Sequence, residues 1–362
     1  MHADAEDIPT RSVQAKAGRA AEGKPPLRVV FMGTPEFAAA ILDRLLNSPH
    51  VECAAAYTQP DRPAGRGKKL TPPPVKILAQ ERGLPVFQPS HFKVNPEGDA
   101  AVHELAALKP DVLVVAAYGL ILPRRVLDIP GLMPVNVHAS LLPKYRGAAP
   151  IQRAVMNGES VTGVTIMRME AGLDTGPMLM QRAVGIDIND TSATLHDELA
   201  REGAELLLLA LERLRAGSLP AIPQDDSRAT YAAKLTKEES LIDFSLPPEA
   251  LHARIRGLTP WPGAVMHLHR EGREPLPVTA APGLFPLTSA MREACPSRPA
   301  AEVHAGQGAI IGLVDNALLV TAAAGCYAFT SLRPAGKKSL DASAFANGYL
   351  TGFPGAFFAG RQ

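Results

Sequence analysis

The sequence predicts an α/β fold, with a mainly parallel sheet covered by helices on both faces, followed by a small β-rich domain. From residue 27 to residue 217, apolar runs of strand length alternate with helical stretches, the pattern that parallel strands require. After residue 217 the chain turns to prolines and acidic residues, and then to short apolar runs between turns. With 362 residues, 46% of them apolar, the chain is long enough for two domains with separate cores.

The first predicted strand, residues 27–32, leads directly into a helix. Thr34 suits the N-cap of that helix and Pro35 its first position. The other elements expected before residue 218 are strands at 53–58, 111–117, 134–138 and 162–167, a helix at 100–108 with Asp99 as its N-cap, and a long helix that ends near Gly217. Together they predict one sheet with crossover helices.

The second part of the chain begins with residues 218–236, which have few apolar anchors and are typical of a linker. Beyond them the sequence predicts a helix at 248–256 and strands at 264–268, 309–314 and 317–321. Residues 271–300 carry six prolines, which favour a long surface loop. Short strands separated by turns predict a small barrel or sandwich.

Composition excludes several classes of protein. The three cysteines, Cys53, Cys295 and Cys326, are too few and too scattered for a disulfide framework or a metal cage, and they fit a reducing compartment. No apolar run approaches the roughly 18–20 residues of a membrane-spanning helix. Residues 1–26 are polar with mixed charge, so we expect a disordered tail rather than a signal peptide. The net charge of +1 argues against a globally basic nucleic-acid binder, although a local patch stays possible.

Three polar side chains form the candidate reaction centre. Asn136 and His138 are two residues apart in the predicted strand 134–138, so both leave the same face. They lie at the carboxyl end of the strand, where open α/β sheets place their ligand crevice. Asp174 follows His138 by 36 residues, within Gly-Leu-Asp-Thr-Gly, and would orient the imidazole from a separate loop. An amide donor, an acid–base group and a carboxylate suit a reaction that develops an oxyanion.

Each of these residues also has a structural explanation. His138 alone could be a core histidine, and Asp174 in its glycine-flanked turn could bond to its own backbone. Two polar side chains on one face of a core strand, however, need partners. We therefore predict that Asn136, His138 and Asp174 act together.

A basic loop follows the second predicted strand, between residues 58 and 76. Against the single acidic Asp61, it carries Arg62, Arg66, Lys68, Lys69 and Lys76. A short charge run is often only a solvated loop. This one starts at the same sheet edge as His138, so it indicates a large, phosphate-rich substrate. Arg333, Lys337 and Lys338 in the second domain would extend the patch.

The motifs around the candidate centre resemble those of a known family. Asn136-x-His138-x-Ser140-Leu141-Leu142-Pro143, then Tyr145-Arg146-Gly147, then Asp174 in its glycine-flanked loop are similar to the formyltransferases that use 10-formyltetrahydrofolate. The basic loop from Gln59 to Lys69 and the segment from Leu332 to Lys338 resemble those of the members that act on methionyl-tRNA. The resemblance covers the chain from about residue 27 to residue 347.

That resemblance implies a fold, a reaction and residue roles. The fold would be a Rossmann-like catalytic domain at 27–217, a linker at 218–236 and a tRNA-binding barrel of the oligonucleotide-binding (OB) type at 237–362. The reaction would carry a formyl group from 10-formyltetrahydrofolate to the α-amino group of initiator methionyl-tRNA, in the cytoplasm, by a monomer that uses no metal and no membrane. The implied roles are catalytic for Asn136, His138 and Asp174, folate-binding for Ser140, Leu141, Leu142 and Pro143, and tRNA-binding for Arg62, Arg66, Lys68, Lys69, Lys337 and Lys338.

Three other activities stay open at this point. A formyltransferase that acts on a small amine would share the donor site, although a small acceptor needs neither the basic loop nor the second domain. A hydrolase would instead release formate from the folate. A non-catalytic RNA-binding protein would leave the three polar residues without a purpose. The sequence also leaves open whether His138 or Asp174 first accepts the amine proton.

Overall fold

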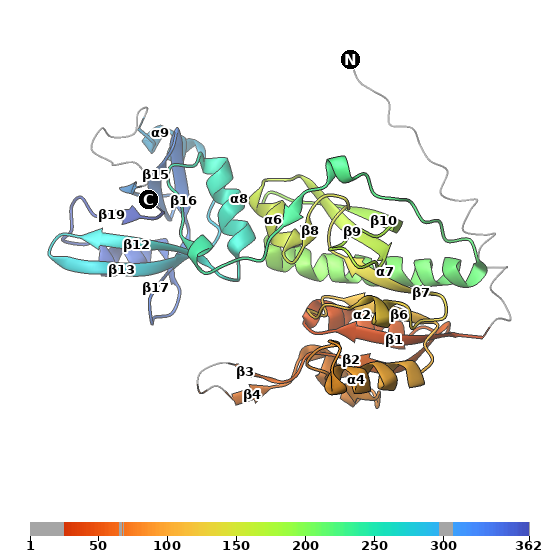
Figure 1. Ribbon diagram of the computed structural model, residues 1–362. Helices are drawn as coiled ribbons and strands as arrows, with labels where there is room; N and C mark the ends of the chain where they lie inside the picture. The colour runs from red at the N-terminus through yellow and green to blue at the C-terminus, as the bar shows by residue number, and fades with distance from the viewer. Residues whose placement is uncertain (1–24, 65–66, 68, 297–306, 362) are drawn as a thin grey trace, which may run out of the picture. The chain divides into compact units, whose positions relative to one another are not determined.

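The computed structural model describes residues 25–64, 67, 69–296 and 307–361, and the chain divides into two compact units (Figure 1). Unit 1 comprises Met1–Arg146, Gly163–Val184 and Asp197–Thr230. Unit 2 comprises Gly147–Thr162, Gly185–His196 and Tyr231–Gln362. Two short stretches from before residue 197 therefore belong to the same unit as the C-terminal part. A disordered tail was predicted at residues 1–26, and residues 1–24 of it lie outside the described residues.

Unit 1 is built on a seven-stranded sheet in the order β10-β9-β7-β6-β1-β2-β5 (Figure 1). The pairs from β7 across to β5 are parallel, whereas β9 runs antiparallel to β7. The strands are β1 (Leu27–Gly33), β2 (Val51–Tyr57), β5 (Val86–Phe87), β6 (Val112–Ala116), β7 (Met133–His138), β9 (Val161–Arg168) and β10 (Met178–Gly185). The mainly parallel, Rossmann-like sheet that the sequence predicts is thus confirmed.

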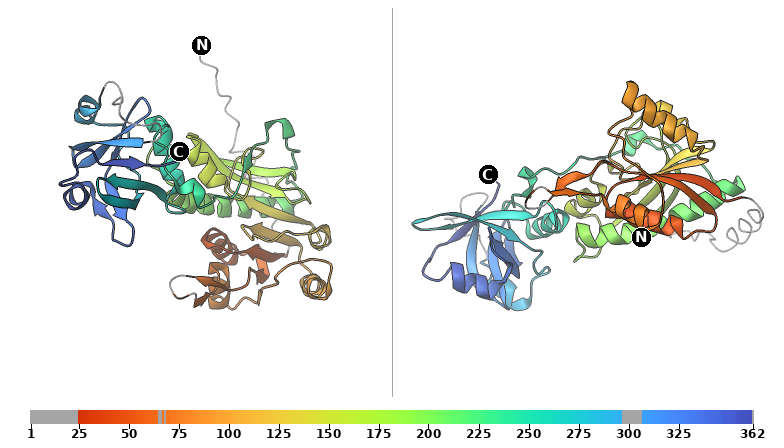
Figure 2. Two further views of the ribbon diagram at one scale, coloured as in Figure 1. Left: turned by 60° about the vertical axis from the view of Figure 1, so that its left-hand side comes forward. Right: turned by 90° about the horizontal axis from the view of Figure 1, so that it is seen from below.

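Helices cover both faces of this sheet (Figure 2). They are α2 (Glu36–Leu46), α3 (Pro74–Glu81), α4 (Pro96–Ala107), α5 (Arg124–Leu127) and α7 (Ser192–Ala216). Leu105 of α4 belongs to the core cluster that contains Val115. Gly203 of α7 lies against the opposite face, where an added Cβ would come within 2.9 Å of Val137. Because side chains alternate along β7, Val137 faces α7 and Asn136 faces the other way. Within the described ranges, no helix is both long and apolar enough to cross a bilayer.

Unit 2 contains a curled, barrel-like sheet of eight strands in the order β16-β15-β14-β19-β12-β13-β17-β18, with every neighbouring pair antiparallel. Its core includes the fully buried Leu251, Met266, Phe329 and Phe358. The strands are β12 (Ala264–Arg270), β13 (Arg273–Ala280), β14 (Gln307–Val314), β15 (Ala317–Ala322), β16 (Gly325–Phe329), β17 (Ser331–Pro334), β18 (Leu340–Asp341) and β19 (Phe357–Ala359). The helices are α6 (Pro150–Met156), α8 (Pro248–Leu258), α9 (Ser289–Ala294) and α10 (Ala342–Tyr349). The predicted small barrel is confirmed.

The remaining elements are short. They are the paired strands β3 (Arg62–Ala64) and β4 (Lys69–Thr71), the paired strands β8 (Arg146–Gly147) and β11 (Tyr231–Ala232), and the 3₁₀ turns η1 (Asp226–Arg228) and η2 (Glu238–Ser240). Two of them, η1 and β11, lie in the stretch that the sequence suggested was a linker.

Two helix starts differ from the prediction. The N-cap of α2 is Pro35, and the Thr34 hydroxyl donates instead to a loop carbonyl at 2.9 Å. Helix α4 starts earlier than predicted, because the side chain of Asn95 caps it by accepting from the Gly98 amide at 2.8 Å. Asp99 therefore lies in the first turn, where its charge suits the helix dipole.

The proline-rich stretch 271–300 is not the long loop that was predicted, since it contains β13 and α9. Proline lacks a backbone N–H and is tolerated where a strand makes no ladder bond on one side. Pro275 and Pro277 precede the part of β13 that pairs with β17, residues 278–280. Prolines that usually argue against a strand are therefore compatible with this one.

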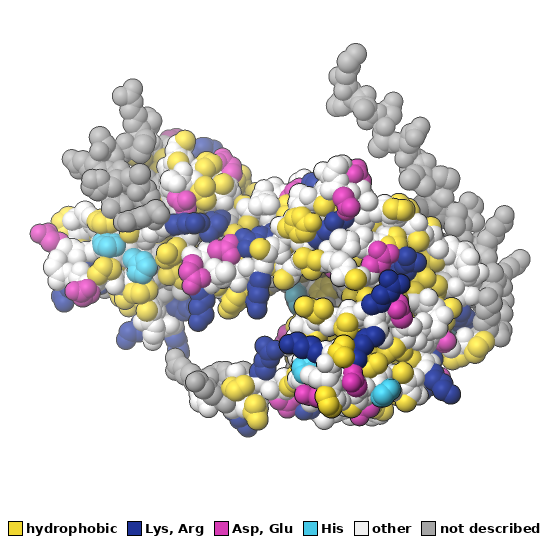
Figure 3. Space-filling view, viewed as in Figure 1, with side chains coloured by type: hydrophobic (Ala, Val, Ile, Leu, Met, Phe, Trp, Pro, Cys, Tyr) yellow, Lys and Arg dark blue, Asp and Glu magenta, His cyan; other side chains and the backbone are white. Residues whose placement is uncertain are grey.

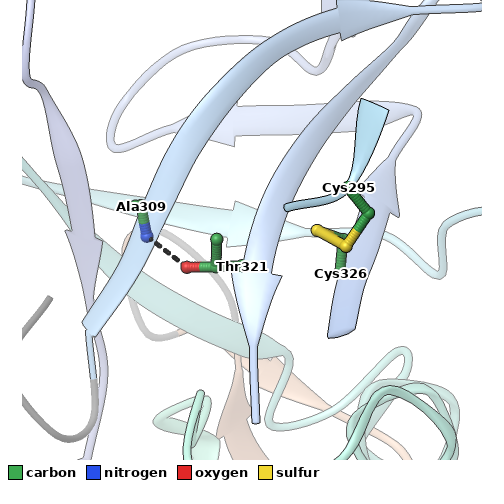
Figure 4. The surroundings of a disulfide bond; sticks show 4 residues. All are labelled: Cys295, Ala309, Thr321 and Cys326. Carbon is green, nitrogen blue, oxygen red and sulfur yellow. Dashed lines mark hydrogen bonds between the residues drawn. A yellow bond between two sulfur atoms is a disulfide. The ribbon is translucent and has the colours of Figure 1, made fainter. Parts of the chain in front are cut away.

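The sequence predicts cysteines that are too few and too scattered for a disulfide framework, yet two of them form a single disulfide. Cys295 and Cys326 form a disulfide with their Cα atoms 6.0 Å apart (Figure 4). The disulfide joins the end of α9 to β16. Nearby, the Ala309 amide of β14 donates a hydrogen bond to the Thr321 hydroxyl of β15 at 2.8 Å (Figure 4). A separation of 31 residues in sequence says nothing about distance in a folded antiparallel sheet. Cys53 is a free thiol whose pKa burial raises to about 12.

Candidate active site

The end of β7 carries the first two candidate residues, Asn136 and His138. Asn136 lies opposite Val115 of the parallel strand β6, and His138 lies opposite Thr165 of the antiparallel strand β9. Asn136 is 9% exposed and His138 is 6% exposed, so both residues are almost fully shielded from solvent. The register of one strand therefore aims both polar groups at the same side of the sheet edge, as predicted.

Asp174 approaches His138 from the loop between β9 and β10. Its Oδ2 lies 3.7 Å from Nδ1 of His138, and its side chain is 17% exposed. That distance is too long for a hydrogen bond but short enough for an ion pair once the imidazole is protonated. The backbone of Asp174 has a φ of 51°, in the left-handed region that few residues other than glycine adopt. The structure thus brings the predicted carboxylate to the predicted imidazole.

The second ring nitrogen of His138 has a partner that the sequence did not suggest. Nε2 lies 2.9 Å from the carbonyl oxygen of Tyr145. A carbonyl only accepts, so Nε2 carries the hydrogen, and in the neutral imidazole Nδ1 is the lone-pair nitrogen that faces Asp174. The Tyr145 carbonyl therefore sets the tautomer of His138, and the Asp174 carboxylate faces the other ring nitrogen. A backbone oxygen can belong to any residue type, so no sequence motif marks it.

The predicted folate-binding segment, residues 140–143, is hydrogen-bonded to the hydroxyl of Thr165 on β9. Thr165 donates to the carbonyl of Ser140 at 2.7 Å, and it accepts from the Leu142 amide at 3.1 Å and from the Gln181 side chain at 3.0 Å. The Ser140 hydroxyl donates to the carbonyl of Lys144 at 2.6 Å. Ser140 and Leu142 are buried, so both side chains already serve the local fold.

A cleft of about 720 Å³ lies beside the Asp174 loop in unit 1. This volume falls in the range of about 300–1,000 Å³ that is typical of small-molecule sites. Two ion pairs line it, Arg124 with Asp128 at 3.3 Å and Arg168 with Glu170 at 3.0 Å. Its other lining residues are Leu127, Pro130, Leu132, Met133, Pro134, Met169, Ala171 and Gly172. No sequence motif indicated this cleft, although its lining residues 169–172 lie just before Asp174.

The predicted basic loop forms the hairpin β3–β4 in unit 1. Arg62 pairs across it with Thr71, and its guanidinium contacts the side-chain oxygen of Gln59. Lys69 is exposed on β4. Two further predicted contacts, Arg66 and Lys68, lie outside the described residues.

Lys76 of the same loop has a structural partner. Its ammonium donates to both carboxylate oxygens of Asp61 at 2.8 Å, and the lysine side chain is 19% exposed. Hydrogen bonds from Gln88 and then from Lys76 hold the pKa of Asp61 below its usual value. Lys76 therefore anchors the base of the hairpin and is not available to a ligand in the way that Lys69 is.

The basic residues predicted in the second domain lie on the surface of unit 2. Lys337 and Lys338 are exposed in the turn between β17 and β18, and Arg333 is exposed on β17. On the face that Figure 3 shows, basic and acidic side chains are interspersed over the surface. This mixture fits the net charge of +1.

Comparison with known proteins places both parts of the chain. Residues 27–211 match the family model described as formyl transferase, and residues 234–350 match its C-terminal domain. The chain is 50% identical over 326 residues to a methionyl-tRNA formyltransferase of Nitratidesulfovibrio vulgaris (strain DP4), covering 90% of this chain and 94% of that relative. It is 49% identical over 322 residues to a methionyl-tRNA formyltransferase of Pseudomonas fluorescens (strain ATCC BAA-477), covering 89% of this chain and 93% of that relative.

Among solved structures, the fold is similar to that of HypX from Aquifex aeolicus in complex with tetrahydrofolic acid. The TM-score is 0.53 at 17% identity, over 90% of this chain and 48% of that chain. At this identity the likeness concerns the fold alone.

Proposed function

The chain belongs to the methionyl-tRNA formyltransferase family, and we propose that it transfers the formyl group of 10-formyltetrahydrofolate to the α-amino group of methionine on initiator methionyl-tRNA. The observation that carries this proposal is the placement of Asn136, His138 and Asp174 around one edge of the sheet. The formylated product would serve the start of translation. We place the reaction in the bacterial cytoplasm and expect a monomer.

The attacking group is the α-amine of methionine, which must be neutral to act as a nucleophile. An α-amino group titrates at about pH 8, so a useful neutral fraction exists near neutral pH. The folate co-substrate supplies a formyl group that is already activated, which is why the proposal includes no metal. As the amine attacks, the formyl oxygen gains negative charge and the nitrogen gains positive charge.

Asn136 is the group that we assign to the negative oxygen. Its amide can donate an N–H from a site that is 9% exposed, where few water molecules compete. A single donor of this kind contributes roughly 3–4 kcal/mol to the stabilisation of a transition state. His138 cannot share this task through Nε2 without giving up its bond to the Tyr145 carbonyl.

His138 is the group that we assign to the amine proton. Nδ1 holds the free lone pair of the neutral ring, and the Asp174 carboxylate 3.7 Å away would stabilise the imidazolium that forms. The new N–C bond forms first and gives a tetrahedral carbon with a negative oxygen. That oxygen then returns its electron pair to the carbon, and the bond from the carbon to the folate nitrogen breaks. His138 then returns the proton to that leaving nitrogen, so the ring ends the cycle neutral.

We propose that the folate occupies the cleft beside the Asp174 loop. The cleft has a suitable volume, and its lining runs to Gly172, two residues before Asp174. Residues 140–143 do not line it, and their role as folate contacts stays a prediction. Since the side chains of Ser140 and Leu142 are buried, any contact of this segment with the folate would come mainly from its backbone or from its other residues.

We further propose that the tRNA contacts exposed basic residues of both domains. Lys69 and Arg62 would contact the acceptor end from the β3–β4 hairpin, together with Arg66 and Lys68. Lys337 and Lys338, in the barrel at 237–362, would contact tRNA phosphates. In this proposal residues 27–217 form the catalytic domain and residues 218–236 link it to the barrel. Lysine and arginine contacts to phosphates would make binding strongly dependent on salt.

One incubation tests the proposal. The protein is mixed with 10-formyltetrahydrofolate and methionine-charged initiator tRNA, and the released amino acid is weighed by mass spectrometry. We expect a gain of one formyl group that is lost in His138→Ala. Deformylated folate without formylmethionine would instead point to a small amine or water as the acceptor. Salt-dependent tRNA binding without turnover would support a non-catalytic binding protein.

A further inference from the structure

A glutamine in the segment between the two matched domains holds the backbone of the Asp174 loop. The side-chain Nε2 of Gln224 donates to the carbonyls of Asp174 and Gly176, both at 2.7 Å. Its Oε1 accepts from Nε and Nη2 of Arg146, at 3.1 and 2.8 Å. A guanidinium only donates and a carbonyl only accepts, so the amide fits in one orientation alone. Arg146 thereby aims the donor end of Gln224 at the loop.

The Arg146 guanidinium is itself held by this segment. Its side chain is 2% exposed, and Nη2 also donates to Oδ1 of Asp226 at 2.6 Å. A buried charge is stable only when it is paired and hydrogen-bonded. Gln224 and Asp226 supply those partners two residues apart, which makes the segment a fixed part of unit 1.

The same segment also reaches the other side of the imidazole. The hydroxyl of Thr230 accepts from the Tyr145 amide at 2.9 Å, and its carbonyl accepts from the Arg146 amide at 2.8 Å. Tyr145 is the residue whose carbonyl accepts from Nε2 of His138. Tyr145 and Asp174 both have positive φ, of 62° and 51°. Such conformations persist only where the surroundings hold them.

We propose that Gln224 is a positioning residue for formyl transfer, which holds the Asp174 carboxylate toward His138 while Arg146 orients the Gln224 amide. Gln224 does not touch the reacting atoms and acts through the backbone of Asp174. The inference deepens the proposed function and rests on it.

The test compares two variants of Gln224. Gln224→Glu keeps the size and the bond to Arg146, but it replaces the donor with an oxygen that repels both loop carbonyls. Gln224→Met removes the donor without adding charge. We expect kcat to fall about ten- to hundredfold in both, because small misplacements in an active site have costs of this size. The KM values for folate and for tRNA should stay within about twofold, since neither substrate is contacted.

Two controls separate positioning from general damage. Gln80→Glu makes the same chemical change at an exposed glutamine of α3 and should leave kcat unchanged. In an Asp174→Asn background, Gln224→Glu should lower kcat by less than about twofold, because the group through which it acts is already impaired.

The outcomes are distinct. Wild-type kcat in both Gln224 variants, with formylmethionine still produced, overturns the positioning role and leaves the proposed function intact. A full additional loss in the Asp174→Asn background overturns the route through Asp174. Loss of the folding transition in both variants would assign Gln224 to the fold and overturn the inference. No formylmethionine from the wild type overturns the proposed function itself, and with it the reaction that this role serves.

Discussion

Residues with positive φ serve different purposes in the two units. In unit 2, Asp315 and Asn316 have φ of 48° and 60° in the two-residue turn between β14 and β15. A type I′ hairpin turn requires this conformation at both positions, and short polar residues tolerate it. In unit 1, Tyr145 and Asp174 have positive φ outside any such turn, each bonded to the segment at 224–230. The left-handed pair Asp315 and Asn316 in unit 2 connects two strands, whereas Tyr145 and Asp174 in unit 1 present a carbonyl and a carboxylate to one imidazole.

From this contrast we expect changes to the polar groups of the two units to affect different measurable quantities. Changes at the site of unit 1 should alter turnover while the unfolding free energy stays nearly constant. Changes in the cross-links and buried polar groups of unit 2 should alter stability while turnover per folded molecule stays nearly constant.

The strongest test of the contrast removes the two polar residues of β7. Asn136→Ala and His138→Ala should each lower kcat by about 10²–10³-fold, because the first deletes an oxyanion donor and the second an acid–base group. KM should change far less. Initial rates of formylation at saturating substrates measure this. His103→Ala, at an exposed histidine of α4, is the matched control. Normal kcat in either β7 variant would remove that residue from the catalytic trio.

The second test breaks the cross-link of unit 2. The double variant Cys295→Ser, Cys326→Ser should lower the free energy of unfolding by about 3–4 kcal/mol, given the 31-residue separation that the disulfide closes. Its kcat should stay within about twofold of wild type. Denaturant titration measures the first quantity. Cys53→Ser removes a thiol without removing a cross-link and serves as the control. Equal stabilities of the double variant and the wild type would contradict the stabilising role of the bond.

The third test changes substrate binding within unit 1. Lys69→Ala should raise the KM for tRNA about three- to tenfold and reduce the salt slope of log kcat/KM by about one, as expected for one lost phosphate contact. The KM for folate should not change. Lys93→Ala, at an exposed lysine of the same unit, is the comparison. An unchanged salt slope would remove Lys69 from the tRNA interface.

The smallest expected effect concerns a buried histidine of unit 2. His252 is 1% exposed and bonds to the Tyr327 hydroxyl at 2.9 Å and to the Ile188 carbonyl at 2.8 Å. Burial lowers the pKa of His252 below its ordinary 6.5. The unfolded chain therefore binds the proton first as pH falls, so stability is full above about pH 6.5 and declines below it toward the folded pKa. Denaturation midpoints between about pH 5 and pH 8 should fall less steeply in His252→Gln than in wild type. Identical slopes would show that this ring does not titrate on unfolding.

Much of the fold was predictable because it depends on patterns that the sequence displays. The strands around residues 112–116 and 133–138 are apolar runs with buried side chains, and the parallel order follows from the helices between them. Asn136 and His138 stood out because polar residues interrupt such a run on one face. Asp174 stood out because glycines flank it.

The unpredicted features lack a pattern of this kind. The carbonyl of Tyr145 and the amide of Gln224 act through hydrogen bonds between distant segments, which leave no periodicity in the sequence. Residues 218–236 contain few apolar anchors, which indicates a linker, and no pattern in them shows that Gln224 bonds to the Asp174 loop. The pairing of Cys295 with Cys326 depends on the path of a curled sheet, which spacing cannot reveal.

The β3–β4 hairpin has a consequence for how such enzymes diversify. It is a separate two-stranded sheet whose pairs are internal, from Arg62 with Thr71 to Ala64 with Lys69. A segment that contributes no strand to the seven-stranded sheet can be lengthened, shortened or exchanged without shifting the register that places Asn136 and His138. Under the proposed tRNA contacts of the hairpin, acceptor choice and bond-making chemistry would depend on separate parts of unit 1, and the hairpin is the segment to exchange in a redesign for a different amine.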